Sequence, residues 1–155
     1  MEMQQKEYST DFQYQSVGFL RRLGAILYDA LLLFTVLIFS HFPIQLLSDG
    51  AAILPGETWH RAYQGYLLAV CFLYFGWFWT HGGQTLGMRT WRICLRDENG
   101  KRISWWQSCV RFLSAILSWL VFGIGFLWVL VDKKRMAWHD RLSGTVMVRI
   151  PRDPK

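Results

Sequence analysis

The sequence lacks the paired cysteines that would build a disulfide framework or a zinc site. Its three cysteines, Cys71, Cys94 and Cys109, are odd in number, lie far apart and include no CxxC pair. A complete set of disulfides is therefore excluded, and no Cys/His group has the spacing of zinc ligands. We expect the protein to bind no metal and no cofactor.

Acidic residues are also scarce. The 11 Asp and Glu stand against 17 Lys and Arg, which gives a formal net charge of +6. In a soluble protein this surplus would suggest nucleic acid, but here the basic residues flank long apolar runs and form no nucleic-acid-reading motif. Anionic lipid headgroups are the simpler partner. No serine or cysteine nucleophile sits in a recognisable catalytic setting, so we do not expect an enzyme.

Charged residues are missing from two long stretches and rare in a third. Apolar blocks cover residues 23–47, 62–80 and 112–131, and the last two contain no Asp, Glu, Lys or Arg. Soluble helices keep a polar stripe, whereas about 20 mainly apolar residues span a bilayer as a helix. We therefore expect an all-α membrane protein with two full transmembrane helices, over residues 18–42 and 61–80, the first ended by Pro43 and the Ser-Asp-Gly segment at residues 48–50.

The third apolar block creates a topological conflict. By the positive-inside rule the loop 41–61, with one basic residue, lies outside, whereas residues 82–111 and the basic tail belong in the cytoplasm. A third full span would put that tail outside. We favour a re-entrant hairpin of two short helices, 107–122 and 126–135, broken at Gly123 and Gly125. A third span stays open, because glycines also occur in ordinary helix interfaces.

Two segments alternate with the two-residue period of a β-strand. Residues 91–96 alternate apolar with polar side chains, and residues 146–150 alternate again. A turn signal, Asp-Glu-Asn-Gly, follows the first segment. We expect the two segments to pair as a small cytoplasmic β element. Residues 1–17 are expected to form a flexible cytoplasmic tail, residues 18–150 one transmembrane domain, and residues 151–155 a C-terminal tail.

A carboxylate lies inside the first apolar run, where an acidic residue costs a few kcal/mol on insertion scales. Asp29 follows Arg22 by seven residues, so on a helix both share one face, about 10 Å apart along the axis. That distance excludes direct contact, so we predict that a third group or a water bridges them. The candidate cations for pairing with Asp29 are Arg22, Arg111 and Arg141.

The charged residues and two glycine-containing segments stand in a characteristic order along the chain. Arg22 and Asp29 come first, then a Gly-Gln-Thr-Leu-Gly segment, then Arg111, then a His-Asp-Arg-Leu segment with Gly-Thr. This order resembles the RDD family of small bacterial membrane proteins, named for one arginine and two aspartates, over residues 18–150. The resemblance implies that the second aspartate is Asp140. The family often has lysine in place of Met88, so that a basic role there passes to the next residue or is lost.

The candidate site therefore has two parts. The intramembrane charge cluster comprises Arg22, Asp29, Arg111, Asp140 and Arg141, and the motif loops comprise Gly83, Gln84, Thr85, Gly87, Arg89, His139, Gly144 and Thr145. Adjacent residues need not face one another, so we expect Asp140 to cap a helix N-terminus or to bind loop backbone, and not to form an acid–base pair with His139.

Two functions remain open for a multi-pass protein of the bacterial cytoplasmic (inner) membrane with a cytoplasmic N-terminus. In the first, Arg22, Asp29 and Asp140 form a polar lock that pins the cytoplasmic loops to the helix bundle. The chain is then a non-transporting accessory or assembly protein that binds another membrane protein or a second copy. In the second, it is a subunit of an oligomeric monovalent cation/proton exchanger. Some members of the resembled family are linked to Na+/H+ exchange, and Asp29 would alternate between a proton and a cation.

Overall fold

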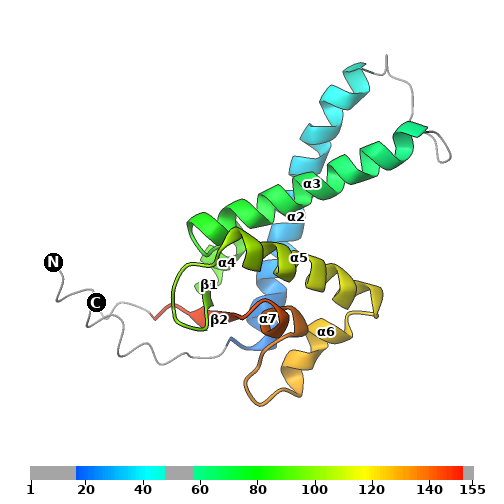
Figure 1. Ribbon diagram of the computed structural model, residues 1–155. Coiled ribbons are helices and arrows are strands. Elements are labelled where there is room, and N and C mark those ends of the chain that lie inside the picture. Colours follow the sequence, from blue (N-terminus) through cyan, green and yellow to red (C-terminus); the bar gives the residue numbers. More distant parts are fainter. Residues whose placement is uncertain (1–16, 48–57, 152–155) are drawn as a thin grey trace.

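The computed structural model describes residues 17–47 and 58–151 as helices with one two-stranded sheet (Figure 1). The elements in chain order are α2 (Phe19–Leu47), α3 (Thr58–His81), α4 (Leu86–Thr90), β1 (Ile93–Asp97), α5 (Trp105–Leu120), α6 (Ile124–Leu127), the 3-10 helix η1 (Trp128–Leu130), α7 (Trp138–Leu142) and β2 (Thr145–Arg149). Most of the predicted N-terminal tail, the middle of the predicted outer loop and residues 152–155 lie outside the described residues. Val17, which was assigned to the tail, is buried in the core.

The first long helix, α2, continues through Pro43 to Leu47, so the prediction that this proline ends the helix is wrong. Proline removes one N–H and disturbs the carbonyls of the preceding turn. In the same turn the hydroxyl of Tyr66 on α3 donates to the carbonyl oxygen of Ser40 at 3.0 Å, which ties this part of α2 to α3. Within a membrane such contacts make an internal proline tolerable.

The apolar side chains of α2 point outward. Leu31, Phe34 and Phe39 are largely exposed, the last at 73%. The buried positions of the same helix are Arg22, Ala25 and Asp29. A soluble protein buries its apolar residues and exposes its charged ones. This helix has the reverse arrangement, as expected where lipid surrounds it.

Helix α5 has the same reversed arrangement. Its buried face carries Ser108, Arg111, Ser114 and Ser118, whereas large apolar side chains such as Trp119 are exposed. Large exposed apolar surfaces mark contact of a protein with lipid or with an apolar partner. The polar interior of the molecule therefore lies between the helices.

The described helices do not confirm the predicted number of membrane spans. In residues 17–47 and 58–151, α2 is the one helix that is long and apolar enough by itself. Helix α5 and the α6–η1 segment reach that standard only as a pair, and they are bent by 109° at their break. The 24-residue α3 does not reach it. The structure thus describes one clear candidate span.

The third apolar block breaks at the predicted glycines. Gly123 adopts a left-handed φ of 73° at the start of α6. Gly125 packs so closely on α5 that an added Cβ would lie 2.1 Å from Oγ of Ser118. The predicted bounds of the second short helix, 126–135, are wrong, because α6 begins at Ile124 and η1 ends at Leu130.

The core lies around the N-terminal part of α2, where Figure 1 shows the sheet, α4 and α7 gathered. Strands β1 and β2 pair antiparallel, from Ile93 opposite Arg149 to Asp97 opposite Thr145. The predicted pairing of the two alternating segments is therefore confirmed. Ile93 and Leu95 are fully buried, so the sheet packs its apolar face into this core.

Candidate functional site: a buried charge cluster and a carboxylate latch

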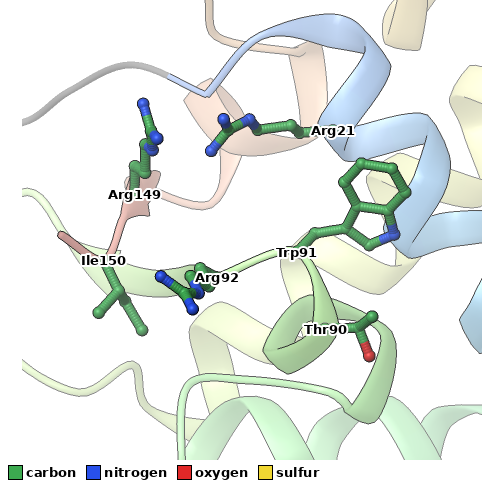
Figure 2. A pocket seen from close by; sticks show the side chains of 6 residues that line it. All are labelled: Arg21, Thr90, Trp91, Arg92, Arg149 and Ile150. Atoms are coloured by element: carbon green, nitrogen blue, oxygen red, sulfur yellow. The ribbon is translucent and has the colours of Figure 1, made fainter. Parts of the chain in front are cut away.

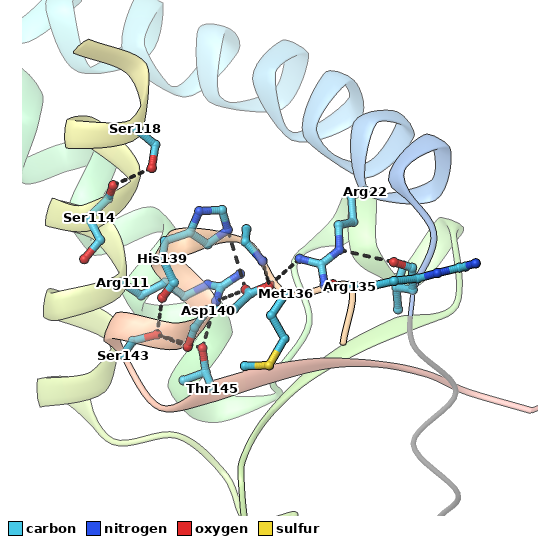
Figure 3. Close-up of polar contacts among 12 residues, drawn as sticks. Arg22, Arg111, Ser114, Ser118, Arg135, Met136, His139, Asp140, Ser143 and Thr145 are labelled. Carbon is cyan, nitrogen blue, oxygen red and sulfur yellow. Dashed lines mark hydrogen bonds and ion pairs between the residues drawn. The ribbon is translucent and has the colours of Figure 1, made fainter. Parts of the chain in front are cut away.

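Asp140 is the centre of a buried charge cluster beside the N-terminal end of α2 (Figure 3). Its exposed fraction is 0%. Arg22 of α2 donates from Nη1 to Oδ2 at 2.5 Å. Arg111 of α5 donates from Nη1 to Oδ1 at 2.6 Å. One carboxylate on the short helix α7 thus joins two helices that are 118 and 29 residues away in the sequence.

The position of Asp140 follows from how α7 begins. Ala137 is the N-cap residue, and its N–H donates to Oδ2 of Asp140 at 2.9 Å. A carboxylate at the third helical position satisfies an orphan N–H and complements the positive end of the helix. The prediction that Asp140 itself caps the helix is wrong, whereas the predicted bond to loop backbone is confirmed.

The cluster holds more positive than negative charge. Two guanidinium groups face one carboxylate, which leaves a net charge of +1. Each arginine also donates to a neutral acceptor. Arg22 donates to the carbonyl oxygen of Arg135 at 2.9 Å, and Arg111 donates to Oγ1 of Thr145 at 2.8 Å. The surplus charge is therefore spread over backbone and hydroxyl dipoles.

His139 belongs to the cluster as a neutral side chain. Its Nε2 lies 3.5 Å from Oδ1 of Asp140, and its ring packs 4.8 Å from that of Phe126, centroid to centroid. Burial, followed by the charge of Arg111, lowers the pKa of His139 to about 3. Burial alone would raise the pKa of Asp140, but the guanidinium groups of Arg111 and Arg22 outweigh it and hold that pKa below its usual range. At neutral pH the carboxylate is ionised and the imidazole is uncharged.

The turn between α7 and β2 is fastened to the same cluster. The hydroxyl of Ser143 donates to the carbonyl oxygen of His139 at 2.5 Å and lies 2.8 Å from Oγ1 of Thr145. Gly144 has a left-handed φ of 59°, and its carbonyl accepts from the side-chain amide of Gln107 at 3.4 Å. The predicted motif residues His139, Gly144 and Thr145 therefore build the turn that positions Asp140.

Asp29 is held separately, by neutral donors from α4. Its Oδ2 accepts from the hydroxyl of Thr85 at 2.5 Å, and its Oδ1 from the N–H of Gly87 at 2.9 Å. Among the described residues, the ion pairs do not include Asp29. The prediction that Arg22, Arg111 or Arg141 is the cation for Asp29 is wrong, because the first two bind Asp140 and the third binds Asp132. We call the contact of Asp29 with Thr85 and Gly87 the carboxylate latch.

The second glycine of the Gly-Gln-Thr-Leu-Gly segment makes the carboxylate latch possible. An added Cβ on Gly87 would lie 2.4 Å from the carbonyl oxygen of Ala25 and 2.9 Å from Cγ of Asp29. Thr85 is the N-cap of α4, and its Oγ1 accepts from the N–H of Met88 at 3.1 Å while its proton goes to Asp29. Helix α4 is thus fixed directly on the backbone of α2.

The first half of that segment holds the edge of the sheet. Gly83 has a left-handed φ of 70°, and its carbonyl accepts from the N–H of Leu95 at 2.7 Å. The side-chain amide of Gln84 donates to the carbonyl oxygen of Ile93 at 2.6 Å. The predicted motif loop therefore connects β1 on one side with Asp29 on the other.

Two predicted site residues lie outside both groups. Arg141 is exposed and pairs with Asp132, because it follows Asp140 directly and so projects from another side of α7. Arg89 is exposed at the end of α4. The single predicted cluster is therefore two sites, the charge cluster around Asp140 and the carboxylate latch around Asp29.

The sequence reasoning missed three contributors. Trp79 is buried with the guanidinium of Arg111 5.3 Å from the centre of its ring. Gln107 forms a reciprocal capping box with Ser104 at the start of α5, a Ser-x-x-Gln spacing that is readable from sequence. Ser143 has no such signal, because its contacts depend on the turn into β2.

Comparison with known proteins decides the family. The model of the RDD family matches residues 16–144, which include both buried carboxylates and the arginines that bind Asp140. The chain belongs to the RDD family. The resemblance inferred from sequence is thus confirmed, and with the exposed apolar α2 it makes this RDD protein a membrane protein.

A relative of this RDD protein occurs in Rickettsia prowazekii (strain Madrid E), where it bears the name Uncharacterized protein RP437. The two are 33% identical over 84 residues, which are 54% of this chain and 46% of the relative. The similarity therefore spans less than half of the relative's length. No solved structure matches this chain.

Proposed function

We propose that this RDD protein is a non-transporting, non-enzymatic scaffold of the bacterial inner membrane. Its charge cluster and carboxylate latch fasten a small β-sheet unit to the membrane helices, where it serves another membrane protein or a second copy in assembly. The observation that carries the proposal is the position of Asp140. This fully buried carboxylate links α7 to both α2 and α5 through Arg22 and Arg111.

The occupancy of both carboxylates supports a structural role. Asp140 accepts from two guanidinium groups and one backbone N–H. Asp29 accepts one hydrogen bond on each oxygen. An exchanger needs a carboxylate that an incoming cation can reach, whereas these oxygens are already engaged by residues that the fold itself supplies. Buried carboxylates whose two oxygens are both hydrogen-bonded hold the elements that bind them in place.

The same contacts support a re-entrant topology. In this proposal α2 and α3 cross the membrane, and α5 with α6–η1 enters and returns. Asp140 of α7 pairs with Arg22 at the start of α2. Helix α7, which follows the bent pair, therefore lies on the side of the membrane where α2 begins. The 109° bend is consistent with such a return. Lys101, Arg102 and Lys133 are exposed. The proposed topology places them on the side of the membrane where α2 begins, which the positive-inside rule assigns to the cytoplasm.

The experiment that tests the proposal measures transport and stability together. The full chain is reconstituted into proteoliposomes with a pH-sensitive dye inside, and pulses of Na+ or K+ are applied to the wild type, Asp29→Asn and the exposed control Glu98→Gln. The scaffold proposal expects no cation-driven proton movement above empty liposomes for any of them. Movement in the wild type and the control that Asp29→Asn abolishes, with its fold intact, would overturn it in favour of the exchanger.

A further inference from the structure

A basic pocket lies at the start of α2, and its lining includes no residue that binds Asp29 or Asp140. Its volume is about 350 Å³. Three segments line it: Arg21 of α2, Thr90 at the end of α4 with Trp91 and Arg92 after it, and Arg149 with Ile150 at the end of β2. Figure 2 shows Arg21 extending from α2 towards Arg149, with Arg92 and Ile150 bordering the same opening. Segments far apart in sequence thus contribute three arginines to the lining of one pocket.

The three arginines have no acidic partner among the residues that the structure describes. Within residues 17–47 and 58–151, the ion pairs of arginine involve Arg22, Arg111 and Arg141 and none of the pocket arginines. The lining contains no carboxylate. Converging positive charges raise the local concentration of anions. The pocket therefore has the charge of an anion site.

The backbone at Arg92 joins two of the segments that line the pocket. Arg92 has a left-handed φ of 52°. Its N–H donates to the carbonyl oxygen of Arg89, and its own carbonyl accepts from the N–H of Ile150 at 2.9 Å. These bonds fix the backbone of Arg92 beside the end of β2, at the edge of the pocket.

The pocket lies where a membrane surface would meet the protein. Arg21 is the third residue of α2, and the apolar run of the candidate span begins directly after Arg22. Leu20 is 77% exposed beside it. Trp91 packs on α2 so closely that a Cβ on Gly24 would lie 2.4 Å from its ring. Arginine and tryptophan together are typical of the headgroup level.

We infer that this pocket is a phosphate site that binds the headgroup of one anionic phospholipid. Guanidinium groups bind phosphate oxygens in bidentate fashion. Three of them outnumber the single charge of a phosphodiester, so they favour a lipid with a net negative charge over a zwitterionic lipid. The apolar run of α2 next to the pocket offers a surface for the acyl chains. This inference goes beyond the scaffold role and does not depend on it, since it requires only that α2 begins at a membrane surface.

The test counts lipids bound to the full chain in a neutral detergent. Dioleoylphosphatidylglycerol or dioleoylphosphatidylcholine is added at equal concentration, and retained lipid is measured by native mass spectrometry. We expect phosphatidylglycerol to stay bound and phosphatidylcholine, whose choline cation the arginines repel, to be lost. Equal retention of both lipids would overturn the inference.

Variants locate the binding. R21Q, R92G and R149Q combined should lower phosphatidylglycerol retention about tenfold or more, since all three guanidinium groups are removed. The matched control K101Q, R102Q and K133Q removes the same charge from exposed positions elsewhere. Equal losses in the two triple variants would mean non-specific attraction and would overturn the site. If the triple variant fails to fold, R92G alone replaces it, because glycine is the residue that a left-handed position prefers. Unchanged phosphatidylglycerol retention in R92G would also overturn the site.

Inorganic phosphate distinguishes a lipid headgroup from free phosphate as the source of the ligand. Continued retention of phosphatidylglycerol in millimolar phosphate supports the lipid. Displacement of the lipid, with phosphate itself found on the chain, overturns the lipid assignment.

Discussion

The two buried carboxylates of this RDD protein, Asp29 and Asp140, solve one problem in different ways. Each fastens a short, distant helix to α2. Asp140, near the start of α2, is bound by Arg22 and Arg111. Asp29, which lies about 10 Å along α2 from Arg22, is bound by the hydroxyl of Thr85 and the N–H of Gly87. Charged partners thus occur near the start of α2, and neutral donors occur about two turns further along it.

This difference predicts unequal effects when each carboxylate is neutralised. Asp140→Asn leaves two buried guanidinium groups without an anion, so we expect it to cost about 3–5 kcal/mol of unfolding free energy. Thermal unfolding in detergent measures the loss, with the exposed Glu98→Gln as control. An unfolding midpoint equal to that of the wild type would contradict the charge cluster.

A combined variant sharpens this prediction. Replacing Arg22, Arg111 and Asp140 together by apolar residues of similar size removes the uncompensated charge that the single change leaves behind. Such replacements are often neutral or stabilising by about 1–4 kcal/mol. The triple variant R22M, R111M and D140L should therefore be more stable than Asp140→Asn alone. A triple variant as unstable as the single one would show that charge is not the cause.

The carboxylate latch is broken most strongly through its glycine. In Gly87→Ala the new Cβ would meet the backbone oxygen of Ala25 at 2.4 Å, and overpacking against backbone costs about 1–3 kcal/mol. Gly65→Ala on α3 is the matched control, because a Cβ there meets nothing within 4 Å. Unfolding midpoints of the two variants should differ clearly, and equal midpoints would refute the close approach of α4 to α2.

Acid distinguishes the two sites as well, because His139 belongs to the charge cluster. Its pKa is about 3 in the fold and about 6.5 in an unfolded chain. Between these values the unfolded state binds the extra proton, so stability falls as pH falls. From pH 6.5 to 5 the loss is about 2 kcal/mol. His139→Gln should flatten the dependence of the unfolding midpoint on pH, and an unchanged slope would contradict the assignment.

Neutralising Asp29 should have the smallest effect. In Asp29→Asn the amide oxygen still accepts from the N–H of Gly87, and the amide NH2 can donate to Oγ1 of Thr85. We expect a loss of about 1 kcal/mol, the net value of a typical hydrogen bond. The measurement is the same detergent unfolding. A loss as large as that of Asp140→Asn would remove the distinction between charged and neutral partners.

Parts of the fold could be predicted because they depend on local pattern. The alternation around Ile93 and Leu95 indicated the strand, and Gly123 and Gly125 indicated the break in the third apolar block. The family residues Arg22, Asp29 and Asp140 were found by their order in the chain. In each case the signal lies within a few residues, or in a spacing that the family shares.

The pairing within the site could not be predicted in this way. Helix geometry places Arg22 and Asp29 on the same face of α2, but it does not reveal which distant loop packs against each of them. That choice depends on the approach of α7 and α4, set by the turn at Gly144 and by the space at Gly87. Helix α2 also continues past Pro43, where Tyr66 of α3 binds the carbonyl oxygen of Ser40.

The central claim is that Asp140 fastens the sheet unit to the membrane helices. Hydrogen exchange of the full chain in lipid nanodiscs, compared between wild type and Asp140→Asn, tests it most directly. We predict faster exchange of amides in α7 and β2, with the apolar part of α2 equally protected in both. Unchanged exchange in α7 and β2 would contradict the claim.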